Sequence, residues 1–418
     1  MKKILPVLAL VFATLLPMQS FAEDTIIDSF FVYSPRIMAQ GGSFTAIASG
    51  HESLYTNPAG FYSKSGSLTI GSFTGWAFMN PVGVMVATGA MTAEEALSTY
   101  GYTYGSPYTF GTAPEQLAPS DPLYANPGDS NYESNADEIS SKAMLAFFKD
   151  QAKYGFGGGG SLGISWVGGG LGLGFIASTN LFMQGDTFPF GISGMASTTL
   201  AVVGGYAMPF QIGNSRLIIG ADLRPMIRVY SKIDASTASG LLTALGVNTD
   251  GTKADSGSSA VFAALNGTSA YQGAGLGIDL GAKWELGAVT LGLSVRDVFG
   301  TRISMYRHKL GDYLNYVYSN GGLPSNESYT GADGTTSTVV QADGTFVIPM
   351  VISAGVAFHP DLGGLSFLFD PTIQADIVDP LGVIRDQQSP WALLHIGTEV
   401  KVLRFIKLRA GINQGYVT

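Results

Sequence analysis

Apolar residues occupy every second position in several segments of the chain. In residues 276–286, leucine, isoleucine, alanine and tryptophan alternate with glycine, aspartate, lysine and glutamate, and residues 289–295 follow the same rule. A period of two is typical of a β-strand whose two faces meet different environments. Because the pattern recurs at least seven times, it predicts a transmembrane β-barrel with lipid outside and polar side chains or water inside.

The alternation predicts an all-β fold, an antiparallel barrel with about 12 strands in this chain. The expected strands are 66–77, 81–90, 159–167, 170–183, 192–207, 215–230, 271–284, 287–297, 345–358, 364–378, 391–403 and 405–416. Short links should face the periplasm, and the long links, about 91–157, 231–270 and 298–344, should be extracellular. Pro349 and Pro371 should mark bulges or kinks, because proline gives the ladder no N–H donor.

The two ends of the chain carry further signals. Lys2 and Lys3, an apolar run over residues 4–16 and a small-residue site ending at Ala22 predict a cleaved signal peptide over 1–22. At the other end, the last expected strand lacks the terminal aromatic residue usual in outer-membrane barrels. We therefore expect a truncated C-terminus after Thr418, and about 14 strands in the complete barrel.

The composition agrees with an exported barrel. Charged residues make up 13% of the chain, against about 25% in ordinary soluble domains, and the mean hydropathy is +0.24. Without Lys2 and Lys3 the chain has 20 basic and 31 acidic residues, an excess of negative charge that argues against nucleic acid as a partner. The sequence contains no cysteine, which excludes disulfide bonds.

Residues 23–63, between the signal peptide and the barrel expected over 64–418, have a different pattern. Apolar residues do not alternate there, small residues are paired, and an Asn-Pro step predicts a turn. Because glycine and alanine permit close approach of neighbouring chains, we expect a compact plug, or hatch, inside the barrel.

The arrangement R-x-x-x-x-G-G-x-x-x-A-I-A, from Arg36 to Ala48, is followed by L-Y-x-N-P-A-G, from Leu54 to Gly60. This combination resembles the amino-terminal hatch of the FadL family, outer-membrane transporters of long-chain fatty acids, and of spirochaete relatives. The resemblance implies a 14-stranded barrel plugged by the hatch, with a path for a hydrophobic ligand to a lateral opening. It also implies a hatch motif of Arg36, Gly41, Gly42, Asn57, Pro58, Ala59 and Gly60.

One feature departs from that family. An acidic pair often precedes its L-Y-x-N-P-A-G motif, whereas this chain has Ser49 and Gly50 at those positions. Hydrogen bonding within the hatch should therefore differ here.

Two long links carry apolar side chains suited to capturing a hydrophobic ligand. The segment 141–149 predicts an amphipathic helix, and residues 241–245 and 261–265 form similar patches. The candidate capture residues are Met144, Phe147, Phe148, Leu241, Leu242, Leu245 and Phe262. The alternative is that these side chains only pack against neighbouring loop residues.

The inward charges have mixed signs, so we expect them to pair across strands or with the plug rather than to line an ion path. No P-loop, nucleophile elbow or metal-ligand spacing of histidines is present. The glycine-rich run 168–174 lies in strand alternation and opens no helix, which argues against nucleotide binding. The sequence therefore predicts no enzyme, no cofactor and no metal site.

The function expected from these features is passive outer-membrane transport of hydrophobic molecules, in particular long-chain fatty acids. Capture by the loops would be followed by release through hatch movement or a lateral opening. Expected partners are the fatty acid or another hydrophobic small molecule, outer-membrane lipid and the barrel-insertion machinery. The alternative is an outer-membrane scaffold or shuttle for surface or secreted proteins; a general porin is less compatible with a plug.

Overall fold

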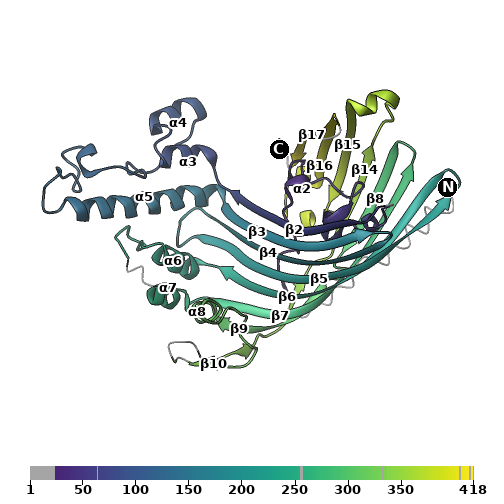
Figure 1. The fold of residues 1–418 in the computed structure, drawn as a ribbon. Coiled ribbons are helices and arrows are strands. Elements are labelled where there is room, and N and C mark those ends of the chain that lie inside the picture. Colours follow the sequence, from purple (N-terminus) through teal and green to yellow (C-terminus); the bar gives the residue numbers. More distant parts are fainter. Residues whose placement is uncertain are drawn as a thin grey trace.

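The computed structural model describes residues 24–63, 65–254, 258–330, 334, 336–403, 406–413 and 416–417. The expected signal peptide lies outside the described residues. One strongly curved sheet dominates the fold, with strand order β18-β17-β16-β15-β14-β8-β7-β6-β5-β4-β3-β2 (Figure 1). Neighbours along this path are antiparallel. The predicted all-β antiparallel class is therefore confirmed. Within the described residues, β2 and β18 are the two ends of this path.

The strands of the path have these bounds: β2 Ser67–Phe78, β3 Phe156–Gly168, β4 Leu171–Gly185, β5 Ile192–Ile212, β6 Ser215–Ile233, β7 Ser269–Leu286, β8 Val289–Arg296, β14 Val351–Phe358, β15 Phe369–Val378, β16 Leu394–Val402, β17 Ile406–Asn413 and β18 Tyr416–Val417. Off the path lie β1 Asp24–Ile26, β9 Thr301–Lys309, β12 Val340–Gln341 and β13 Thr345–Ile348, while β10 Tyr329–Thr330 and β11 Thr336–Ser337 form a separate pair.

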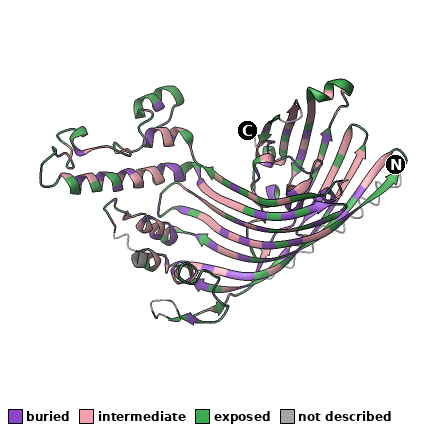
Figure 2. Cartoon of the chain, in the orientation of Figure 1, coloured by how far each residue is buried: buried purple, intermediate pink, exposed green. Residues whose placement is uncertain are grey.

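The predicted two-faced strands are present. On β6, Ile219, Leu223 and Ile227 are exposed on the convex face, whereas Arg224 and Arg228 are buried on the concave face. Figure 2 shows exposed and buried residues alternating along the long strands. Exposed apolar side chains continue over the neighbouring strands and make a wide apolar belt on the convex face. A surface of this kind is typical of a protein face that contacts lipid.

Several expected elements differ in the structure. Residues 81–90 were expected to be a strand, but they begin with helix α3, Pro81–Ala87, because the side chain of Asn80 caps the helix by accepting hydrogen bonds from Val82 N and Gly83 N. The strand expected over 364–378 starts with the 3₁₀ helix η4, Gly363–Phe367, and becomes β15 only at Phe369. The local capping signal and the short turn outweigh the apolar alternation at these places.

Two neighbouring strands of the sheet, which forms the wall of the molecule, are interrupted where one continuous strand was expected. The strand expected over 345–358 is interrupted at Pro349 and Met350, which confirms the expected kink, whereas Pro371 lies within uninterrupted β15. The strand expected over 287–297 resumes after residues 297–300 as β9, inside a segment expected to be a loop. Positive φ angles at Asp297 and Phe299 turn the chain there. β7 consequently pairs with β8 at one end and with β9 at the other.

Helices gather at one end of the curved sheet, and tight turns such as 169–170, 213–214 and 287–288 connect strands at the other (Figure 1). The helical end carries α3, α4 Ala93–Tyr100, η3 Pro114–Gln116, α5 Tyr132–Tyr154, α6 Ala235–Ala244, α7 Ser258–Leu265 and α8 Leu310–Asn320. The link from β15 to β16 contains α9 Pro380–Arg385 and η5 Pro390–Leu393. None of the described helices has both the length and the apolar character needed to cross a membrane.

The N-terminal segment, residues 27–61, lies against the concave face of the sheet (Figure 1). It contains α2 Pro35–Met38, η1 Gly50–Tyr55 and η2 Pro58–Phe61. The main apolar cluster joins Phe30, Leu54 and Phe61 of this segment to wall residues such as Ile176 and Ile218. The largest core of the molecule is therefore the interface between the segment and the wall. Just before the segment, β1 pairs in parallel with β13.

Candidate functional site

Glycines on the concave face create the room that the N-terminal segment fills. Gly220 on β6 and Gly281 on β7 are register partners. A Cβ atom at Gly220 would lie 2.5 Å from the carbonyl carbon of Pro58, and one at Gly281 would lie 2.0 Å from Oδ1 of Asn57. Real Cβ atoms do not approach other atoms this closely, so any larger residue here would push the segment away from the wall.

The same relation holds around the wall. At each of nine glycines on the described strands, a Cβ would lie 2.0 to 2.7 Å from an atom of the N-terminal segment. We call this set the glycine ring: Gly163, Gly172, Gly174, Gly205, Gly220, Gly281, Gly292, Gly397 and Gly411. The ring was missed in the sequence, although its signal was present as glycine at positions that alternate with outward apolar residues.

Asn57 ties the segment together and to the wall. Its side-chain Nδ2 donates to Thr45 O at 2.9 Å and to Ala282 O at 3.3 Å. Its Oδ1 accepts from Ala59 N at 3.0 Å, which caps η2. Pro58 occupies the first turn of η2, and a Cβ at Gly60 would lie 2.6 Å from Ala48 O. The Asn-Pro-Ala-Gly sequence therefore folds locally into a tight, buried corner.

The remaining residues of the expected motif also lie at the wall. Gly41 and Gly42 have φ angles of +63° and +81°, which glycine adopts readily. Gly41 O accepts a hydrogen bond from Nδ1 of His395 at 2.7 Å. The Arg36 guanidinium lies over the Phe44 ring and within 3.8 Å of carboxylate oxygens of Glu52 and Glu399. The structure thus brings the whole motif into one interface between segment and wall.

The inward charges form pairs, as expected. Arg224 Nη1 lies 2.5 Å from Asp279 Oδ2, and its Nη2 lies 2.8 Å from Asp297 Oδ1, with all three side chains buried. Arg228 pairs with Asp28 of the N-terminal segment. Asp222 is the exception in this cluster. It is 3% exposed, and neither of its carboxylate oxygens has a hydrogen-bond partner among the described residues.

Wall cations also hold the segment through its backbone. Arg296 Nη1 donates to Phe30 O at 3.0 Å and to Tyr55 O at 3.1 Å. Lys283 Nζ donates to Ala48 O at 3.0 Å. Charged donors form stronger hydrogen bonds than neutral ones, so these contacts hold the segment firmly in the concave face.

The two predicted capture patches come together at the helical end of the sheet. Met144 and Phe148 from α5 pack on the same cluster as Leu241 and Leu242 from α6. The Phe148 ring stacks on Phe188 at a centroid distance of 5.9 Å. Much of this set therefore packs between α5, α6 and the wall.

The other predicted capture residues lie elsewhere. Phe147 packs in a separate cluster and lies 5.5 Å from the Phe110 ring. Leu245 is 51% exposed, and the Phe262 ring is 6.1 Å from that of Tyr318. Phe147 nevertheless contacts Phe148, because the centroids of the two rings lie 5.5 Å apart.

A groove with a volume of about 580 Å³ runs between α5 and the β4–β5 link. We call it the arm groove. Its charged and aromatic lining consists of Tyr108, Lys142, Lys149, Asp150, Lys153, Asp186, Phe188, Phe190 and Asp250. Lys149 and Lys153 were missed as site residues in the sequence, although their spacing of four places them on one side of a helix.

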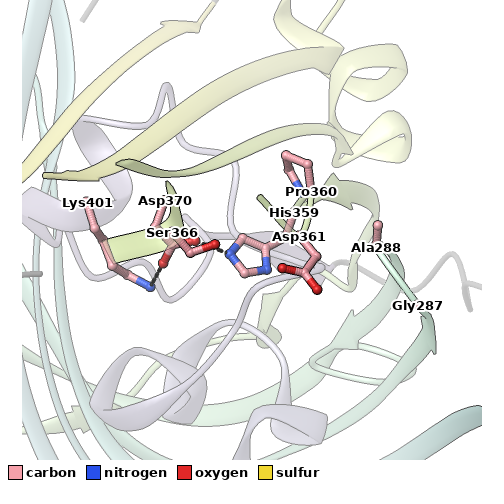
Figure 3. A pocket seen from close by; sticks show the side chains of 8 residues that line it. All are labelled: Gly287, Ala288, His359, Pro360, Asp361, Ser366, Asp370 and Lys401. Carbon is pink, nitrogen blue, oxygen red and sulfur yellow. Dashed lines mark hydrogen bonds and ion pairs between the residues drawn. The ribbon is translucent and has the colours of Figure 1, made fainter. Parts of the chain in front are cut away.

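A second cavity, of about 750 Å³, lies at the tight-turn end. It is lined by Gly287, Ala288, His359, Pro360, Asp361, Ser366, Asp370 and Lys401. Figure 3 shows the Asp370 carboxylate between His359, at 2.5 Å, and Lys401, at 3.1 Å. Five of these eight lining side chains are polar or charged. In the part of the chain that the structure describes, no group of three or more histidine or acidic side chains is placed to hold a metal ion.

Comparison with models of known protein families gave no match. Comparison with curated proteins also gave none. Among solved structures, the chain is similar to the toluene transporter TodX of Pseudomonas putida, with 12% sequence identity and a TM-score of 0.37, over 93% of this chain and 84% of that chain. At this identity and TM-score the similarity carries no argument by itself. The function has to be inferred from this chain's own residues.

Proposed function

We propose that the protein allows hydrophobic molecules, long-chain fatty acids among them, to cross the bacterial outer membrane without an energy source. The observation that carries this proposal is the combination of two surfaces on one sheet. The convex face exposes a belt of apolar side chains, while residues 27–61 pack against the concave face. A belt of this kind suits lipid, and a segment packed inside the curved sheet favours a gated path over a permanently open water channel.

In this proposal the N-terminal segment acts as the hatch. Its fit into the glycine ring supports this role, because the strands carry glycine, which has no side chain, at the positions that face the segment. Separate bonds from Arg296, Lys283 and Asn57 to backbone oxygens hold it. Such contacts can break in steps while the strand ladder stays intact, which permits a hatch that moves without unfolding the wall.

The helical end would supply the capture step. The apolar cluster of Phe148, Phe188 and Leu242, with Leu245 and Phe190 exposed beside it, gives a hydrocarbon chain a surface on which to leave water. Burial of apolar area contributes about 25 cal/mol per Å². The ligand would then pass towards the hatch and leave through hatch movement or sideways through the wall.

The alternative function is a scaffold or shuttle for surface proteins. It is supported by exposed aromatic side chains on the loops, such as Tyr100 and Tyr318, because tyrosine is enriched at protein interfaces.

One experiment separates the two functions. The protein is purified in detergent, and its co-bound lipid is identified by mass spectrometry, while cells expressing it are tested for uptake of a radiolabelled long-chain fatty acid. Transport requires faster uptake than in cells without the protein, and enriched acyl compounds on the purified protein. A lipid-free protein with no uptake that binds one surface protein would instead support the scaffold.

A further inference from the structure

We propose that the arm groove binds the headgroup of a zwitterionic amphiphile, a molecule with both a protonated amine and an anionic group beside its acyl chain. This inference rests on the proposed function and names the class of ligand that the capture step takes. It follows from the signs of the charges that line the groove, from one buried carboxylate oxygen without a donor, and from the aromatic side chains opposite.

The anionic part of the headgroup would meet Lys149 and Lys153. Both line the groove from α5, one helical turn apart, and both are exposed. Neither forms an ion pair with another described residue. Lys142, the third lysine that lines the groove, already forms an ion pair, because its Nζ lies 2.9 Å from Glu138 Oε1. The groove therefore offers, at its rim, two cations that are not held in an ion pair with a described residue.

The amine would meet Asp150 and Asp186. Asp150 lines the groove although it is only 3% exposed. Its Oδ2 accepts a hydrogen bond from Tyr102, whereas its Oδ1 has no hydrogen-bond partner among the described residues. A buried carboxylate oxygen without a donor is costly, and an ammonium group supplies three N–H donors.

The surroundings of Asp150 influence its charge. Burial raises the pKa of the Asp150 carboxyl, against the opposing effects of the Tyr102 hydrogen bond and of Lys153. The hydroxyl of Tyr104, also buried, has no hydrogen-bond partner within the described residues. Burial, followed by the charge of Asp150, raises the pKa of Tyr104 to about 12, so this hydroxyl stays neutral.

Asp186 supplies a second acidic group from the β4–β5 link. It is exposed, lines the groove opposite α5, and forms no ion pair with another described residue. The third acidic residue is occupied, because Asp250 Oδ1 accepts hydrogen bonds from Thr252 N and Oγ1. Free charges of both signs therefore face the same space.

The acyl chain would extend from the headgroup across aromatic side chains of the groove. Phe190, which is 70% exposed, and Phe188 line the groove together with Leu145. Phe188 continues into the cluster that contains Phe148 and Leu242, so the chain is led from the groove towards the wall.

A simple fatty acid fits this lining less well. Its carboxylate would pair with the lysines but would be repelled by Asp150 and Asp186, and it has no N–H donor for Oδ1 of Asp150. A headgroup with both signs pairs with both sets of residues. Charge complementarity of this kind discriminates between ligands that share the same chain.

The test uses the full-length protein in detergent and two probes with the same palmitoyl chain. Lysophosphatidylethanolamine carries an amine and a phosphate, whereas palmitate carries only a carboxylate. Binding is measured by native mass spectrometry and calorimetry. The wild type should bind the first probe at least about tenfold more tightly, the effect of one charged hydrogen bond. Equal affinity for the two probes would overturn the inference.

Variants then locate the headgroup. Asp186→Asn, and Asp150→Asn in a second protein, should remove most of the preference, while the double variant Lys149→Ala and Lys153→Ala should weaken both probes. Glu133→Gln, an exposed change at the far end of α5, is the matched control and should bind like the wild type. Because Asp150→Asn also alters the bond to Tyr102, a preference that survives in Asp186→Asn and in the lysine variant contradicts the inference.

The outcome is separable from that of the proposed function. Preferential binding of lysophosphatidylethanolamine without any uptake of acyl compounds by cells would overturn transport and leave the headgroup assignment standing. Uptake of palmitate together with equal binding of both probes would overturn the headgroup assignment and leave transport standing.

Discussion

A bulky residue at Gly281 should push the hatch away from the wall. The position is on β7, and its Cβ would lie 2.0 Å from Asn57 Oδ1 and 2.8 Å from Pro58 Cδ. An ordinary contact begins at 3.4 Å, so the hatch has to withdraw by about 1.4 Å at this point. In Gly281→Val the β-branched side chain cannot bend away, because its first branch lies at Cβ itself.

The energy needed to withdraw the hatch follows from the hydrogen bonds near this contact. Three hydrogen bonds join the hatch to β7 and β8 there: Asn57 Nδ2 to Ala282 O at 3.3 Å, Lys283 Nζ to Ala48 O at 3.0 Å, and Ser294 Oγ to Thr56 O at 2.5 Å. A withdrawal of this size would break them at about 1 kcal/mol each, or about 3 kcal/mol in total. The ratio of seated to unseated hatch should then fall by about a hundredfold.

Conductance in planar lipid bilayers measures this ratio. With the proposed hatch seated, the wild type should be nearly silent, whereas Gly281→Val should open frequently. Gly71→Val on β2 is the matched control, since no other atom lies within 4 Å of its Cβ position; it should stay silent. If Gly281→Val inserts into bilayers but conducts no more than the control, the glycine ring does not seat the hatch and the reasoning fails.

Further predictions concern buried charges and the loops. Arg224→Leu leaves Asp279 and Asp297 without their partner and should lower the free energy of unfolding in urea by about 3–5 kcal/mol; an unchanged urea midpoint would contradict the pairing. Asp222→Asn removes a buried charge that has no hydrogen-bond partner among the described residues, so its unfolding free energy should equal or exceed that of the wild type, and a large loss would refute this. Phe148→Ala removes the ring that stacks on Phe188 and should lower hydrocarbon binding together with the protection of α5 against proteolysis; loss of binding with full protection would indicate direct ligand contact alone. Burial lowers the pKa of His308, at the loop end of β9, from 6.5 to about 4. The folded state therefore binds this proton only at a lower pH than the unfolded state does. The free energy of unfolding should consequently fall as the pH drops from about 6.5 towards 4. His308→Phe should flatten that part of the pH profile, measured by thermal unfolding, and an unchanged profile would show that other groups are responsible.

Part of the fold follows from local sequence alone. The alternation along 215–230 predicted both the strand and the side on which each residue lies, and the structure places Ile219 outside and Arg224 inside accordingly. Such a prediction succeeds because neighbouring side chains of a strand point to opposite faces whatever the rest of the chain does. It failed at residues 81–90, where the cap by Asn80 favoured a helix.

The candidate site was only partly predictable. The Asn57–Gly60 corner could be recognised because its turn is formed by adjacent residues. The sequence did not show that Phe148 stacks on Phe188. Nor did it show that two separate loop patches meet around Leu242. These contacts depend on how far α5 and α6 lean over the wall, which no local pattern encodes.

The sequence by itself determined which face of each strand is apolar, where small residues are concentrated, and which segment does not belong to the wall. The tertiary structure alone decided that nine glycines on eight strands meet one segment, that Asp222 is left without a hydrogen-bond partner among the described residues, and that Lys149, Lys153 and Asp186 face one groove. The physical reason is that strand geometry repeats every two residues and is fixed locally. Contacts between distant segments instead depend on strand register and sheet curvature, which are set by the packing of the whole molecule.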